Sequence, residues 1–162
     1  MRDFLLVAGL IVLPASVSSS QEFTPRVMYP DDPRLQRLVD FFEKRDSPLS
    51  HHAVDFLIAA DENALDWRLL PSISMVESSG GKDYRNNNVF GWDSCNEGFT
   101  SVREGIHFVA GQLANSRRYR NKSLDAKLRT YNPDPDYPNR VKAFMRTLAP
   151  TEEALLVPPT LN

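Results

Sequence analysis

Apolar residues recur three or four positions apart through most of residues 33–148, which is the spacing that places them on one face of an α-helix. Residues of the kind that cap helix N-termini stand just before several of these segments: Asp32, Asp66, Ser101 and Ser123. We expect helices that begin close to residues 33, 50, 66, 101, 123 and 138. The pattern therefore predicts a mainly α domain.

One segment breaks the helical pattern. Between Lys82 and Phe99 the residues are mostly Asn, Gly, Asp and aromatic, which favours turns over a helix. We expect either an irregular loop or one short β-hairpin built from residues 90–92 and 98–99. The expected fold class is thus mainly α, of an α+β type, in which a compact helical domain carries a small irregular or hairpin lobe.

The N-terminus is typical of a secretory signal peptide. Arg2 precedes an apolar run at residues 4–13, and small residues follow up to Ser20. The run is about half as long as the roughly 20 residues that a membrane-spanning helix needs. We therefore expect residues 1–20 to be removed on export, which leaves a secreted or periplasmic protein of the cell envelope with no stable membrane span.

The ends of the remaining chain lack an apolar period. Residues 21–32 contain two prolines and are interpreted as a flexible linker, and residues 150–162 contain three and are interpreted as a flexible tail. The folded domain is accordingly expected at residues 33–149.

Charge and cysteine content exclude several classes of function. The net charge of −2 gives no basic field for nonspecific binding to phosphates, so nucleic acid is not expected as a partner. We also expect the protein to be a monomer. Cys95 is the only cysteine, which rules out an intramolecular disulfide, and no histidine partner marks it as a nucleophile. His51 and Asp55 lie one helical turn apart but lack a third ligand. No metal or cofactor is therefore expected.

Glu77 stands out as a candidate catalytic acid. It follows Ile73 by four residues and Leu69 by eight, so helical geometry places its carboxyl group on the apolar, inward face. Partial burial and the negative end of the helix dipole both raise the pKa of such a carboxyl group. A carboxylic acid that keeps its proton near neutral pH is what glycoside cleavage requires. The alternative is a surface glutamate at a fraying helix end.

Four segments resemble known hydrolases of bacterial cell walls. Residues 66–82 resemble the catalytic helix of lysozyme-like peptidoglycan hydrolases, in which a Glu-Ser pair closes the helix. Residues 86–92 resemble the Asn-Asn-x-Phe-Gly segment of bacterial glucosaminidases, residues 99–106 the helix opening that follows it, and residues 131–141 their Tyr-x-x-Asp-Pro-x-Tyr segment. The segments occur in the family's order over residues 50–148.

This resemblance implies a lysozyme-like glycan cleft with Glu77 as general acid. The corresponding family is that of mannosyl-glycoprotein endo-β-N-acetylglucosaminidase-like enzymes, and the substrate would be the glycan strands of peptidoglycan. Tyr131 is expected to face the cleft near the acid, where it orients substrate or stabilises positive charge. The other expected substrate-binding residues are Ser78, Asn87, Asn88, Phe90, Gly91 and Trp92.

Among these, Phe90 and Trp92 would offer flat faces to sugar rings, and Asn87 and Asn88 would contact acetamido groups. The alternative is that the aromatic residues pack the small lobe while the asparagines satisfy a turn.

The identity of a second catalytic group stays open, and so does the reaction. Asp93 and Glu97 are the candidate second carboxylates, and the alternative for each is a solvated loop residue. Lytic transglycosylases of the same superfamily usually carry a Gly-Leu-Met-Gln-type segment where this chain has residues 90–92, which favours the glucosaminidase branch. A lytic transglycosylase, a muramidase and a noncatalytic peptidoglycan-binding domain remain as alternatives.

Overall fold

The computed structural model describes residues 29–96 and 98–149. Within them lie six α-helices: α1 (Pro33–Glu43), α2 (Ala53–Glu62), α3 (Leu69–Ser78), α4 (Val102–Asn115), α5 (Leu124–Tyr131) and α6 (Tyr137–Leu148). Short 3-10 helices are η1 (Tyr29–Asp31), η2 (Pro48–His52) and η3 (Trp92–Cys95). These residues contain no strand, only an isolated bridge between Arg85 and Asn88. The mainly α expectation is confirmed, and the small lobe is an irregular loop rather than a hairpin.

The predicted helix starts arise from local hydrogen bonds. Ser101 Oγ accepts a hydrogen bond from Glu104 N at 3.1 Å, which forms the predicted N-cap. The Glu104 carboxylate accepts one from Thr100 N at 2.6 Å, one residue before the N-cap, rather than from Ser101 N as in a capping box. Ser123 caps α5 as Ser101 caps α4. Asp66 differs, because its carboxylate binds Arg68 N at 3.0 Å one turn before α3 begins.

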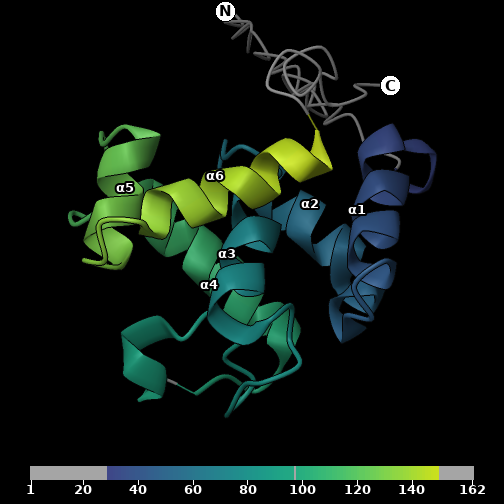
Figure 1. Cartoon of the computed structure of the whole chain (residues 1–162), viewed down its shortest axis with the longest axis horizontal. Coiled ribbons are helices and arrows are strands. Elements are labelled where there is room, and N and C mark those ends of the chain that lie inside the picture. Colours follow the sequence, from purple (N-terminus) through teal and green to yellow (C-terminus); the bar gives the residue numbers. More distant parts are fainter. Residues whose placement is uncertain (1–28, 97, 150–162) are drawn as a thin grey trace, which may run out of the picture.

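Helix α3 lies at the centre of the domain. Seven of its ten residues are buried, which is typical of a helix surrounded by protein on most sides. It packs most extensively against α6, which crosses it, while α2 packs against α4 (Figure 1). The core therefore forms around the helix whose last turn carries Glu77.

The predicted linker overlaps the folded domain. Asp32 is 3% exposed and forms an ion pair with Arg34, which also contacts Asp61 of α2 at 2.8 Å. The Tyr29 hydroxyl donates to the same Asp61 carboxylate at 3.2 Å. The described fold thus includes Tyr29–Asp31 and the Asp32 cap ahead of α1, because the side chains of Tyr29 and Asp32 contribute to this charge cluster. The rest of the predicted linker, the signal peptide and the tail lie outside the described residues.

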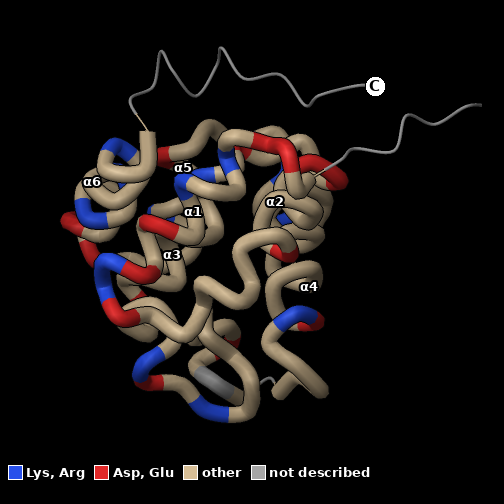
Figure 2. The backbone as a smooth tube through the Cα atoms, turned by 90° about the vertical axis from the view of Figure 1, so that its right-hand side faces the viewer, with Lys and Arg blue, Asp and Glu red and all other residues tan. Residues whose placement is uncertain are grey.

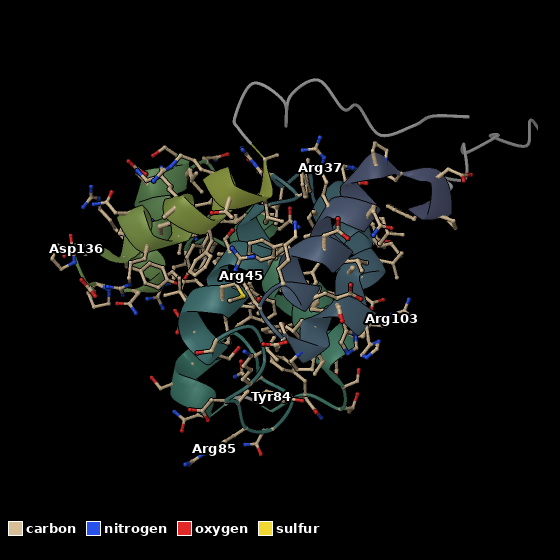
Figure 3. The ribbon with its side chains drawn as sticks, turned by 45° about the vertical axis from the view of Figure 1, so that its right-hand side comes forward. Arg37, Arg45, Tyr84, Arg85, Arg103 and Asp136 are labelled. Atoms are coloured by element: carbon tan, nitrogen blue, oxygen red, sulfur yellow. The ribbon has the colours of Figure 1, made fainter. Side chains whose placement is uncertain are left out.

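Residues 79–101 connect α3 to α4 as the small lobe. The lobe is closed at its base, where Phe99 N donates to Asn86 O at 2.9 Å and the Asn87 side chain donates to Phe99 O at 2.8 Å. Tyr84 and Arg85 point outward at its far end, and Tyr84 is 40% exposed (Figure 3). The lobe thus extends from the end of α3, where Glu77 lies.

No helix in the described ranges combines the length and apolar character needed to cross a membrane. The apolar run at residues 4–13 is outside those ranges. Lysine and arginine are interspersed with aspartate and glutamate in the view of Figure 2 rather than gathered by sign.

Candidate functional site

A pocket of about 650 Å³ opens between the small lobe and the segments that flank α5. This volume is within the range of roughly 300–1,000 Å³ that is usual for small-molecule sites. We call it the Glu77 pocket. Its lining residues come from three stretches of chain and the end of α3: Glu77, Gly91, Trp92, Asp93, Ser94, Arg118, Tyr119, Tyr131, Asn132 and Pro133.

Glu77 reaches the pocket from the last turn of the buried helix α3. Burial raises the pKa of its carboxyl group, while the nearby Tyr137 hydroxyl and the charge of Arg140 act in the opposite direction without cancelling that effect. Neither Glu77 Oε1 nor the Tyr137 hydroxyl has a partner with acceptable hydrogen-bond geometry among the described residues, although both atoms are buried. The direction of the pKa change agrees with the expectation from helical spacing.

The small lobe approaches the acid most closely at Gly91. A Cβ atom at this position would lie 3.1 Å from Glu77 Oε2, closer than side-chain carbons ordinarily come to an oxygen. The backbone φ of Gly91 is +57°, a left-handed conformation that favours glycine. Both the backbone conformation of residue 91 and the short distance to the Glu77 carboxyl group therefore favour glycine at this position.

Three aromatic side chains form one wall of the pocket. The Trp92 ring lies 5.9 Å from the Tyr119 ring and 5.7 Å from the Tyr131 ring, between ring centroids. Tyr131 also stacks on Tyr137, with centroids 5.9 Å apart and planes 5° apart. Its hydroxyl donates to Phe90 O at 2.7 Å. Trp92 and Tyr131 thus both line the pocket that contains Glu77, and Tyr131 is anchored to the lobe.

Asn88 holds Trp92 in this wall. Its side chain is bonded at both ends to the Trp92 backbone: Oδ1 accepts from Trp92 N and Nδ2 donates to Trp92 O, each at 2.9 Å. Asn88 itself is only 1% exposed. We therefore assign Asn88 a role in positioning the lobe and not the substrate contact that was expected.

Three other expected substrate contacts also belong to the framework. Phe90 is fully buried and packs edge-on against Phe56, so its ring has no face open to a sugar. Ser78 is buried, and its hydroxyl donates to Val89 O at 2.7 Å, joining α3 to the lobe. Asn87 is the lobe-closing residue described above, and it does not line the pocket.

Of the two candidate second carboxylates, Asp93 lines the pocket. It is exposed and adopts a left-handed backbone conformation, with φ +50°, in the turn after Trp92. Glu97 lies outside the described residues. Of the two candidates, Asp93 is thus the one that the described structure places in the pocket with Glu77.

The structure also brings further residues to the pocket. Arg118 and Tyr119 line it. They belong to a basic stretch, residues 117–122, that the sequence predicts to be a solvated helix end, with contact to anionic wall polymers as the alternative. Tyr137 lies in the segment that resembles the glucosaminidases and was assigned no role, yet its hydroxyl lowers the pKa of Glu77. The sequence alone does not place Arg118 in this pocket, because Arg118 reaches it through the connection between α4 and α5.

The other groups considered from the sequence lie elsewhere. Asp55 contacts His52 Nδ1 at 3.0 Å and Arg103 Nε at 3.3 Å rather than His51. Within the described ranges, no three His, Cys, Asp or Glu side chains are grouped so as to hold a metal ion.

Comparison with protein-family models, with curated proteins and with solved structures found no match to this chain. The chemistry of the Glu77 pocket therefore has to be argued from its own residues.

Proposed function

We propose that this chain is a glycoside-cleaving enzyme with a lysozyme-like arrangement, which cuts β-1,4 bonds between amino sugars in peptidoglycan. Glu77 is the general acid. The observation that carries the proposal is a carboxyl group with a buried oxygen and a raised pKa, on the wall of a pocket that also presents aromatic rings. Such a group stays protonated at a pH where an exposed glutamate is ionised.

The pocket suits a sugar chain as well as an acid. Pyranose rings have apolar faces that stack on aromatic side chains, and the half-buried Trp92 and Tyr131 supply such side chains. Asn132 and Ser94 add polar groups on the same lining. The central helix α3, whose last turn carries the acid, and the lobe that follows it, which forms a wall of the pocket, support this proposal.

The first step of the reaction is transfer of the Glu77 proton to the oxygen of the glycosidic bond. The bond between that oxygen and the anomeric carbon breaks, the leaving sugar departs as an alcohol, and positive charge develops on the other ring. Glu77 is then a carboxylate. Tyr131 is held beside this centre by its hydrogen bond to Phe90 O, so its ring position is defined before substrate binds.

Completion of hydrolysis needs a water molecule and a base. Asp93 is the remaining carboxylate among the described pocket residues, and we assign it to accept the proton of the attacking water. An inverting enzyme requires about 6.5–9.5 Å between the two carboxyl groups. If the substrate's own hydroxyl attacks instead, the product is an anhydro sugar and the enzyme is a lytic transglycosylase.

The test is the substitution Glu77→Gln, assayed on purified cell walls. It keeps the size of the side chain and removes the proton donor, so release of soluble fragments should fall by about a hundredfold or more. Glu43→Gln is the matched control, because Glu43 is also near a helix C-terminus but is exposed. Retained activity in the Glu77 variant, with unchanged circular dichroism, would overturn the proposal.

Mass spectrometry of the released fragments identifies the reaction. Reducing N-acetylglucosamine ends indicate a glucosaminidase, reducing N-acetylmuramic acid ends a muramidase, and anhydro ends a transglycosylase. The exposed backbone turn that carries Asp93 favours one other candidate, a noncatalytic glycan-binding domain. Binding to cell walls with no fragments released across a pH series would support that alternative.

The remaining expectations are part of the same proposal. A substrate in the cell wall requires export, which agrees with the signal peptide predicted for residues 1–20. No cofactor is needed for acid-catalysed cleavage of a glycosidic bond.

A further inference from the structure

Arg118 brings a cationic side chain to the wall of the Glu77 pocket. Its Nη2 atom donates to Thr130 O at 3.2 Å, and its guanidinium lies 5.7 Å from the centroid of the Tyr119 ring. A guanidinium has five N–H donors, so these contacts orient the group while leaving most donors without an acceptor among the described residues. The exposed side chain is therefore presented to the pocket with unused hydrogen-bonding capacity.

A second arginine near the site behaves differently. Arg140 forms an ion pair with Asp134 at 2.8 Å, and its charge lowers the pKa of Glu77. Arg118 has no carboxylate at ion-pair distance among residues 29–96 and 98–149. Because Arg140 is the cation that acts on the pKa of the acid, we place the contact made by Arg118 on a neighbouring part of the substrate and not on the reacting oxygen.

We propose that Arg118 is a specificity-determining residue that binds a carboxylate on the sugar chain, so that the pocket selects acidic over neutral amino-sugar polymers. This inference rests on the proposed function, since it concerns the substrate of the same pocket. The planar fork of a guanidinium matches the two oxygens of a carboxylate and binds them through paired hydrogen bonds. Peptidoglycan carries such groups, either on the lactyl ether of its acidic sugar or on the attached peptide, whereas polymers of N-acetylglucosamine carry none.

The rest of the pocket is consistent with one defined anion contact. Trp92 and Tyr131 bind ring faces of acidic and neutral sugars equally well, so they cannot discriminate by charge. Asp93 lies on the same lining and would repel a carboxylate. A negatively charged group is therefore stabilised at Arg118 and disfavoured at Asp93, which gives the bound chain one direction.

The experiment measures binding in the Glu77→Gln background, so that no ligand is consumed. Three soluble probes are titrated by calorimetry: a neutral N-acetylglucosamine tetramer, a peptide-free acidic tetramer with lactyl carboxylates, and a peptide-bearing tetramer. Addition of Arg118→Gln should weaken binding of at least one acidic probe by about tenfold to a hundredfold, as expected for loss of a charge-assisted pair. Binding of the neutral probe should change by less than about twofold.

Two further variants separate charge from shape. Arg117→Gln removes an exposed cation from the same stretch without touching the pocket lining, and it should leave all three affinities unchanged. Arg118→Lys keeps the charge but loses the fork, so it should bind the acidic probe with intermediate affinity. Which acidic probe responds identifies the lactyl group or the peptide as the source of the carboxylate.

The inference is overturned if Arg118→Gln weakens the neutral and acidic probes equally, or if it weakens neither. It can also be told apart from failure of the proposed enzyme. If Arg118→Gln weakens only acidic probes while the Glu77→Gln protein still cleaves cell walls fully, the catalytic proposal is refuted and the role of Arg118 stands. If the Glu77→Gln protein loses cleavage but Arg118→Gln does not discriminate between probes, the catalytic proposal stands and the role of Arg118 is refuted.

Discussion

Substitution of Gly91 by alanine tests how closely the small lobe approaches the acid. An L-residue in the left-handed conformation of Gly91 costs about 1–2 kcal/mol relative to glycine. The new Cβ atom would also lie 3.1 Å from Glu77 Oε2, so the carboxyl group must move by a few tenths of an ångström. We expect a loss of about 2 kcal/mol in the free energy of unfolding. Displacement of the acid should lower activity about tenfold.

The same substitution at Gly111 provides the control. Gly111 is inside α4, where the nearest atom to an added Cβ is Asn63 Oδ1 at 3.9 Å. Alanine there should raise the free energy of unfolding by about 0.5–1 kcal/mol, because it reduces the freedom of the unfolded chain. Urea denaturation measures both variants, and fragment release from cell walls measures activity. A Gly91→Ala protein as stable and as active as the original would refute the placement of the lobe against Glu77.

Two other substitutions probe the groups around the acid. Tyr137→Phe removes a hydroxyl that lies close enough to the Glu77 carboxyl group to lower its pKa, so that pKa should rise. Because a general acid works only while protonated, the alkaline limb of the pH–rate profile should then move to higher pH, and a limb that stays in place or moves to lower pH would contradict this. Ser78→Ala removes the hydrogen bond to Val89 O and leaves Gly81 N without its acceptor, so the free energy of unfolding should fall by about 1–3 kcal/mol. A change below about 0.5 kcal/mol in urea denaturation would argue against a structural role for the Ser78 hydroxyl.

Local patterns anticipated the helices well. Ser101 was expected to cap the helix that follows it, and its side chain does so by accepting a hydrogen bond from Glu104 N. Apolar residues at helical spacing in that helix are buried, namely Val102, Ile106, Val109 and Leu113. Such predictions succeed because a helix cap and a buried stripe involve residues within one or two turns of each other.

Predictions for the lobe were less successful because its residues depend on distant partners. Asn88 was expected at the substrate, but it is buried with its side chain bonded to the Trp92 backbone. Phe90 was expected to offer a flat face to a sugar ring, yet it packs on Phe56 of α2. A loop sequence does not show which of its aromatic side chains turns inward, since that depends on where the core offers space.

The sequence alone determined where the helices lie and that Glu77 stands on the buried side of one of them, because both follow from the period of a single helix. The tertiary structure alone decided what surrounds that carboxyl group. Gly91 against Glu77, Tyr131 beside Trp92 and Arg118 on the pocket wall are contacts between distant stretches of chain. They exist because α3 is packed beneath α6 and the lobe folds back over its end, and no local period encodes how two elements pack together.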